Sequence, residues 1–347
     1  MLKNQNVLFL IKIQKVEFNS YGNKKNQWIG WVYLMPALIL MLIFMFFPLI
    51  VTTLTAFKND FRIVENPFLQ FFYPNEWRFE GKPSNANYFK DLNYGFGGFK
   101  AVFTNTDFWQ YYVPNTLIIV FVSVPISITL SLLIAVSLNS IKKLQKVYQT
   151  IFFMPYVTNT IALGMVFAVM FGSNPNGLIN SSLLMLGQKS IDWLGQNAEP
   201  ATVRFTGMAV LIIYSVWQAL PFKILILLSG LQGIDKQYYQ AAQIDGTSKF
   251  RMLMRITVPL LSPQIIYLSI TSFIGAFKEY NSVIAIFNND GTSTVGQKPL
   301  FGTIVLYIYN FTIKKPNVAS AAAVFLFAII MLFTLLNKWI SNKFVYY

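Results

Sequence analysis

Cysteine and histidine are both absent from the 347 residues of this chain. Their absence excludes disulfide bonds, thiolate nucleophiles, histidine general bases and most zinc sites. Charged residues are also scarce, at 12% of the chain against roughly 25% in a soluble globular protein. The chain also lacks the G-x-x-x-x-G-K-[ST] sequence of a phosphate-binding P-loop. We therefore expect no catalytic residue, no metal site and no cofactor or ATP bound by this chain.

Hydrophobic residues are abundant and make up 55% of the chain, with aromatic residues at 17%. This composition is typical of a polytopic membrane protein. A hydrocarbon core of about 30 Å requires about 20 apolar residues per helix. Six segments reach this length, so we predict an all-α membrane protein with six transmembrane helices. The predicted spans are residues 28–57, 115–138, 147–171, 205–229, 258–277 and 318–338.

The net charge of +14 is concentrated in short segments beside the apolar spans. This location follows from membrane topology, so we expect no nucleic-acid partner. If the N-terminus is cytoplasmic, the cytoplasmic segments carry 14 Lys and Arg in 76 residues, and the opposite face carries 12 in 132. The higher density of basic residues places the N-terminus and residues 230–257 in the cytoplasm.

The spans divide the chain into five parts. Residues 58–114 form an external loop or lid whose length predicts a small folded element rather than a tight turn. The complete division is a basic cytoplasmic extension at 1–27, the first span at 28–57, the external loop at 58–114, a core with the other five spans at 115–340, and a cytoplasmic C-terminus at 341–347.

The segment between the fourth and fifth spans, residues 230–257, is predicted to form a polar hairpin. Asp235 begins a helical turn, and Gly246 ends it because glycine readily adopts the left-handed conformation found after helices. Most loops between helices only connect them. Here, small residues such as Ala241 and Ala242 would let another backbone approach closely, which favours a docking surface for a partner.

This hairpin also carries a recognisable pattern. Ala241-Ala242-x-x-Asp245-Gly246, with Pro259 following, resembles the E-A-A-x-x-x-G signature of the coupling loop in sugar permeases of binding-protein-dependent ABC importers. The ATPase-docking residues that the resemblance implies are Gln240, Ala241, Ala242, Asp245 and Gly246.

Other parts of the chain extend the resemblance to most of its length. Two further segments are similar to the sequence of the first permease type of the maltose system. They are Asp107-Phe108-Trp109, which precedes Asn115-Thr116, and the run 302–309. The resemblance implies the MetI-like fold of type I ABC importer permeases, with an extended external loop after the first helix.

Three departures from the family pattern affect the expected docking and loop structure. Gln240 stands in place of the signature Glu, which in the family meets a basic residue of the ATPase. Glutamine keeps a hydrogen bond but loses the charge, so docking should be less sensitive to salt. Thr247 replaces a common Ala, and residues 289–291 replace a Gly-Gly-Pro stretch.

The resemblance also implies a set of partners. These are a second homologous permease subunit, two subunits that bind ATP and Mg, an extracellular solute-binding protein, a sugar substrate and the lipid of a bacterial plasma membrane. Within the ABC class, a permease for glycerol phosphate or another polar solute remains open. A secondary transporter would need intramembrane carboxylates or an ion site, and the predicted spans contain almost no acidic residues.

A candidate substrate path follows from helical spacing in the fourth and fifth spans. Each span presents several small or polar residues on one face. Because the two spans are antiparallel, these faces pair at equal depth, Phe222 with Ser272 and Gln218 with Ala276. Such residues often only bond one helix to another, but the resemblance aligns them with sugar-contacting positions. The predicted path is lined by Ser215, Gln218, Ala219, Phe222, Ser272, Ala276 and Glu279.

Three further residues are candidates for the same path. Trp217 and Tyr280 could stack on a sugar ring. Lys223 is an ionisable residue inside a span, which suggests either a functional role or a side chain that extends toward the cytoplasmic interface. Glu279 lies beside Lys278, so an ion pair or a solvated carboxylate is an alternative to substrate contact.

Overall fold

The structure of the chain is a computed structural model. Within the described residues the chain is helical, and its β-structure is limited to one isolated bridge between Lys58 and Tyr94. This confirms the all-α prediction. The predicted N-terminal extension, most of the external loop and residues 289–291 lie outside the described residues. The structure describes residues 27–59, 94–141, 145–172, 177–194, 200–287 and 298–344.

The chain divides into two compact units, residues 1–54 and 55–347. Helix α2 (Gln27–Met41) continues through the π-helical turn η2 (Leu42–Phe46) into α3 (Phe47–Ala56), whose last two residues belong to the second unit. Together they form an uncharged apolar helix, Gly30–Ala56, that is long enough to cross a membrane. This helix overlaps the first predicted span, residues 28–57.

Three spans of the second unit are single long helices that extend beyond their predicted ends. The first, Phe108–Ser140, contains η4 (Phe108–Tyr112), α6 (Val113–Ile118), η5 (Ile119–Ser123) and α7 (Val124–Ser140). The others lie in α11 (Pro200–Gln232) and α18 (Pro316–Phe344). Their ends are more polar than their centres, which is why hydropathy alone places the boundaries too far inward.

The third predicted span is bent by 97° between α8 (Gln145–Val157) and α9 (Thr160–Met170). Asn159 leaves the helical conformation, with ψ at 124°, and its side-chain oxygen accepts hydrogen bonds from the backbone N–H groups of Ile161 and Ala162. A polar N-cap therefore starts a new helix inside an apolar segment. The sequence prediction of one continuous span did not include this bend.

The fifth predicted span is likewise divided. The short helices α13 (Lys249–Met252), η6 (Leu253–Thr257) and α14 (Val258–Leu260) meet α15 (Ser262–Phe277) at an angle of 71°. If each bent pair counts as one span, the described residues contain up to six spans by length and composition. This agrees with the predicted number.

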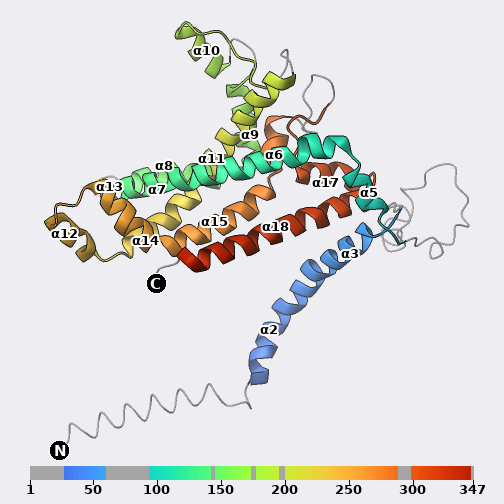
Figure 1. The fold of residues 1–347 in the computed structure, drawn as a ribbon, viewed down its shortest axis with the longest axis horizontal. Coiled ribbons are helices and arrows are strands. Elements are labelled where there is room, and N and C mark those ends of the chain that lie inside the picture. The colour runs from blue at the N-terminus through green and yellow to red at the C-terminus, as the bar shows by residue number, and fades with distance from the viewer. Residues whose placement is uncertain are drawn as a thin grey trace, which may run out of the picture. The chain divides into compact units, whose positions relative to one another are not determined.

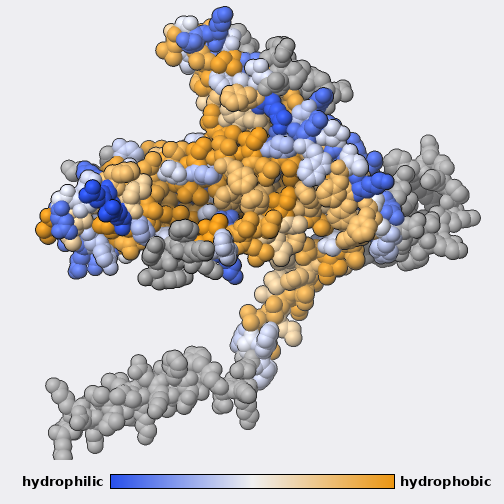
Figure 2. All heavy atoms as spheres, in the orientation of Figure 1, coloured by the Kyte–Doolittle hydropathy of each residue, from blue (hydrophilic) through white to orange (hydrophobic). Residues whose placement is uncertain are grey.

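Figure 1 shows α7, α15 and α18 side by side along one direction, with the hairpin helix α12 (Lys236–Ile244) beyond one end of the bundle. Two shorter helices, α5 (Gly97–Phe103) and α17 (Ile304–Thr312), lie toward the other end, and α10 (Leu178–Met185) projects to one side of the bundle. A further short helix, α16 (Asn281–Ile286), packs against α9. Apolar residues cover much of the long helices, whereas hydrophilic residues gather around α12 (Figure 2).

Two of the sequence motifs contact each other in the core. The Asn115 side chain is fully buried, and its Nδ2 donates hydrogen bonds to the carbonyls of Leu300 (2.9 Å) and Gly302 (3.1 Å). The Thr116 hydroxyl accepts from the backbone N–H of Ile304 at 3.0 Å. Burial makes these bonds costly to break, so they hold the start of α17 against α6.

Close helix packing requires glycine at position 207 in α11. An added Cβ would lie 2.5 Å from Cζ of Phe301, whose ring stacks on Phe287 with centroids 3.8 Å apart. We expect Gly207→Ala to destabilise the protein by about 1–3 kcal/mol through overpacking. Gly275→Ala in α15 is the matched control, because its Cβ would enter open space. That variant should gain about 0.5–1 kcal/mol from helix propensity. Thermal unfolding in detergent measures both, and equal melting temperatures for the two variants would contradict this account.

Candidate functional site

The hairpin contains a short helix with a defined cap at each end. At its start, the Asp235 carboxylate accepts a hydrogen bond from the backbone N–H of Gln237 at 2.9 Å. At its end, Gly246 has φ of +69°, and the N–H groups of Gly246 and Thr247 donate to the carbonyls of Gln243 and Ala242. This is the Schellman arrangement, which satisfies the last carbonyls of a helix. The predicted start and stop of the helix are confirmed.

The second leg of the hairpin is tied to the first by side chains. Ser248 caps α13 by accepting from the N–H of Arg251. The Tyr239 hydroxyl and the Thr257 hydroxyl form a hydrogen bond at 3.0 Å, and Thr257 is buried. This bond joins α12 to η6, so the hairpin is a structured unit rather than a loose linker.

The five residues predicted to contact an ATPase differ in exposure. Gln240, Ala241, Asp245 and Gly246 are exposed, whereas Ala242 is buried within the hairpin. Ala242 therefore stabilises the hairpin from inside. Ile244 is 86% exposed and Phe250 is 69% exposed. Large apolar side chains grouped on a polar surface are typical of a protein contact.

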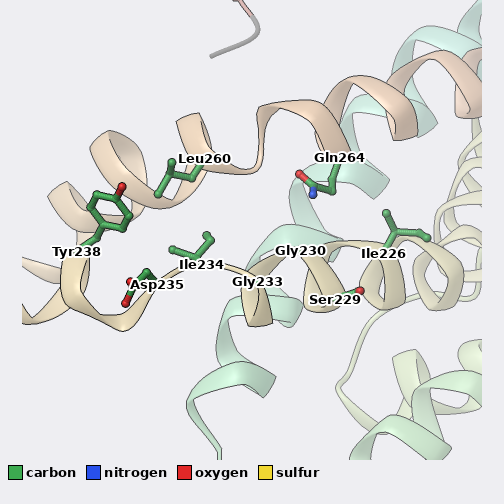
Figure 3. Close-up of a pocket in the computed structure, with 9 residues that line it drawn as sticks. All are labelled: Ile226, Ser229, Gly230, Gly233, Ile234, Asp235, Tyr238, Leu260 and Gln264. Atoms are coloured by element: carbon green, nitrogen blue, oxygen red, sulfur yellow. The ribbon is translucent and has the colours of Figure 1, made fainter. Parts of the chain in front are cut away.

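A pocket of about 530 Å³ lies at the root of the hairpin. Figure 3 shows it between the end of α11, the start of α12 and the chain around Leu260 and Gln264. A Cβ at Gly230 would lie 3.1 Å from Cγ of Gln264. Gly230 and Gln264 therefore face each other across α11 and α15. Their residue numbers have the same sum as those of the predicted pairs Phe222–Ser272 and Gln218–Ala276, so the antiparallel register is the same. The lining residues are Ile226, Ser229, Gly230, Gly233, Ile234, Asp235, Tyr238, Leu260 and Gln264.

The α11 residues of the predicted path gather around the bend between α8 and α9. Gln218 Nε2 donates to the Thr160 hydroxyl at 2.8 Å, and the Phe222 ring stacks on Tyr156 with centroids 6.0 Å apart. The Ser215 hydroxyl oxygen is buried and has no hydrogen-bond partner among the described residues. Ala219 is half-buried on the same helix. These contacts make the bend part of the candidate site.

The bend was missed in the sequence, although a signal is present. Residues 155–160 read PYVTNT, which places a proline and three polar residues inside an otherwise apolar segment. A proline and a capping residue within a predicted span indicate a broken helix. The missed contact residues are Tyr156 and Thr160.

The α15 residues of the predicted path have other surroundings. Ser272 is half-buried, and Ala276 packs against the cluster around Phe108 and Phe277. The Glu279 carboxylate accepts hydrogen bonds from the Tyr280 N–H, the Ser282 N–H and the Ser282 hydroxyl. It thus joins the end of α15 to the start of α16, rather than pairing with Lys278. Gln218 of α11 bonds Thr160 of α9, not a residue of α15. Within the described part of the chain, no hydrogen bond joins the α11 residues of the predicted path to its α15 residues.

The two additional aromatic candidates contact aromatic residues of the chain itself. Trp217 lies 5.3 Å from Phe167 and 6.4 Å from Tyr214, measured between ring centroids. Tyr280 lies 5.1 Å from Tyr309. Both rings therefore have structural partners in the second unit.

Lys223 does not extend toward the cytoplasmic interface, and its functional role stays a prediction. It is 4% exposed, and its ammonium group donates a hydrogen bond to the Ser127 hydroxyl of α7. Burial beside α7 excludes the extended position at the interface. Among the described residues, no carboxylate lies within ion-pair distance of this ammonium group.

The Lys223–Ser127 contact predicts a non-additive effect on stability. Ser127→Ala should destabilise the protein by about 1–3 kcal/mol, because it removes the hydrogen-bond partner of a buried charge. Lys223→Met should be neutral or stabilising, because replacing a buried charged group by an apolar one of similar shape often is. In Lys223→Met, the further change Ser127→Ala should then have little effect. Thermal unfolding of the four proteins measures this, and additive losses would contradict it.

The described residues contain no group of three or more His, Cys, Asp or Glu side chains that could hold a metal ion. The polar groups gathered at the α8–α9 bend are a serine, a threonine and an amide. They can donate and accept hydrogen bonds with an uncharged ligand.

Comparison with known proteins gives the family. Residues 127–346, more than half of the chain, match the model of the binding-protein-dependent transport system inner membrane component. The chain is 29% identical to the arabinooligosaccharides transport system permease protein AraP of Bacillus subtilis (strain 168) over 66% of this chain and 71% of that protein. It is 28% identical to the lactose transport system permease protein LacF of Rhizobium radiobacter over 89% of this chain and 91% of that protein.

A solved structure extends the comparison to the fold. The crystal structure of a bacterial ABC transporter involved in the import of the acidic polysaccharide alginate matches with a TM-score of 0.70 and 22% identity. The match covers 94% of this chain and 99% of that chain. The predicted permease fold is therefore confirmed. From the extent of the family match, we conclude that this chain belongs to the family of binding-protein-dependent transport system inner membrane components.

Proposed function

We propose that this chain is a transmembrane permease subunit of an ATP-driven importer for a sugar or oligosaccharide. The observation that carries the proposal is the capped hairpin, with its exposed Ile244 and Phe250, in a chain of this family. Relatives named for arabinooligosaccharide and lactose transport support a saccharide substrate.

The hairpin would face the cytoplasm and dock on ATP-binding subunits. One related structure is a complex of the alginate transporter with a periplasmic protein that carries an alginate pentasaccharide. By analogy, this chain would pair with a second permease and receive its substrate from an external binding protein. ATP binding would then shift the helices between two packings that open to opposite sides.

The substrate would cross near the bend between α8 and α9. Transporters commonly form their sites at discontinuous helices near the middle of the membrane. Here the Gln218 amide bonds Thr160, the exposed ring of Tyr156 stacks on Phe222, and the Ser215 hydroxyl lies one helical turn before Gln218 in α11. Hydroxyl and amide groups next to an aromatic face suit a neutral polyol, and no carboxylate is needed for binding.

Reconstitution tests the proposal. The permease pair and ATP-binding subunits are placed in proteoliposomes together with the solute-binding protein, and uptake of labelled arabino-oligosaccharides, lactose and maltose is measured. We expect uptake of at least one saccharide that requires both ATP and the binding protein. Uptake by this chain alone, driven by an ion gradient without ATP, would overturn the proposal.

A further inference from the structure

We infer that the pocket at the root of the hairpin receives a basic segment of the ATP-binding subunit, with a Lys or Arg side chain bound at Asp235. The inference rests on the proposed function, because it requires an ATP-binding partner at the hairpin. It adds a contact beyond the exposed residues on the tip of the hairpin.

The electrostatics of the pocket favour a cation. Asp235 contributes the only charged side chain that lines the pocket among the described residues. The pocket borders the C-terminal end of α11 and the N-terminal end of α12, whose partial charges have opposite signs, so the carboxylate sets the charge of the pocket. The hairpin has four basic residues, but none of them lines the pocket, and no other Lys or Arg of the described residues does.

Two hydrogen-bond acceptors in the pocket are incompletely used. Gln264 Oε1 is buried and has no hydrogen-bond partner among the described residues. Asp235 Oδ1 accepts from the Gln237 N–H, and an ionised carboxylate can accept about four hydrogen bonds in all. A buried acceptor without a partner is costly, so a ligand with N–H donors would stabilise this pocket once rotation of the Gln264 side chain turns this oxygen toward it.

The shape of the pocket favours a segment over a single ion. Figure 3 shows Asp235 and Gln264 toward opposite ends of the pocket, with Ile234 between them. A segment that carries several N–H donors could bond both acceptors. Ile226, Ile234 and Leu260 provide apolar walls on which the methylene groups of a Lys or Arg side chain can pack.

Two exposed aspartates provide a matched pair for the test. Asp235 lines the pocket, whereas Asp107 lies before η4, outside the hairpin, and its side chain makes no cap hydrogen bond. Asp235→Asn removes the charge but keeps a side chain that caps helices equally well. Asp107→Asn makes the same chemical change outside the hairpin.

The affinity of the assembled permease pair for the ATP-binding subunit is measured at a series of NaCl concentrations from low to high. We expect Asp235→Asn to weaken binding about tenfold at low salt and to reduce its salt dependence, because a charge-assisted contact is lost. Gln264→Met should weaken binding about threefold without changing the salt dependence. Asp107→Asn should leave both unchanged. If Asp235→Asn behaves like Asp107→Asn, the inference is wrong.

Photocrosslinking separates failure of the inference from failure of the proposed function. A photoreactive amino acid is introduced at Leu260, which lines the pocket, or at Phe250, which is exposed on the hairpin outside it. We expect both to crosslink to the ATP-binding subunit, with Leu260 crosslinking to a peptide that contains Lys or Arg. A crosslink from Phe250 alone would overturn the pocket inference and retain the proposed function. Crosslinks from neither position would overturn both.

Discussion

Gly246→Val is expected to reduce saccharide uptake tenfold or more while the protein still reaches the membrane. The backbone at Gly246 has φ of +69°, a conformation that costs an L-residue roughly 1–2 kcal/mol. A β-branched side chain disfavours this backbone conformation, so it would weaken the two hydrogen bonds that end α12. It would also project from the surface of the hairpin. Apart from its chain neighbours, no atom of the described residues lies within 4 Å of the added Cβ. Any collision would therefore be with a docked partner.

Gly187→Val is the matched control for this prediction. Gly187 has φ of +74°, follows α10 in the same Schellman arrangement, and its Cβ would also enter open space. The backbone strain is thus comparable, but the residue lies far from the hairpin in the sequence. Uptake, ATP hydrolysis and co-purification of the ATP-binding subunit are measured for both variants. Equal losses in the two variants would show that backbone strain, rather than docking, explains the effect.

The hairpin could be predicted from sequence because its signals are local. Asp235 and Gly246 act through bonds to residues within a few positions, so their identities alone define the ends of α12. The burial of Ala242 could not be predicted in this way. It depends on how the second leg folds back, which the Tyr239–Thr257 hydrogen bond helps to fix.

The surroundings of the candidate substrate path were predicted less completely because they depend on tertiary contacts. Helical spacing correctly grouped Gln218 and Phe222 on one face of α11. Hydropathy did not reveal the bend that brings Thr160 to this face, because the average over a window hides one capping residue. The partner of Lys223, Ser127, lies 96 residues away in the sequence. No local pattern connects the two.

The second large effect is expected at Gln218. Its amide nitrogen donates to Thr160, and its carbonyl oxygen has no hydrogen-bond partner among the described residues. We expect this oxygen to accept from a sugar hydroxyl in the transporter. Gln218→Leu keeps the side-chain volume but removes the amide. It should cost about 1–3 kcal/mol of substrate binding, or roughly a 5- to 150-fold rise in the KM for uptake.

Thr160→Val distinguishes substrate contact from helix packing. It breaks the same Gln218–Thr160 hydrogen bond but leaves the amide of Gln218 free to bind substrate. If Gln218 contacts the sugar, Thr160→Val should raise the KM less than about threefold, and both variants should assemble with the ATP-binding subunits as the unmodified protein does. If Gln218 only bonds α11 to α9, the two substitutions remove the same interaction and should have the same effect. The comparison therefore tests whether the polar face of α11 binds substrate or only joins two helices, and uptake kinetics in proteoliposomes give the answer.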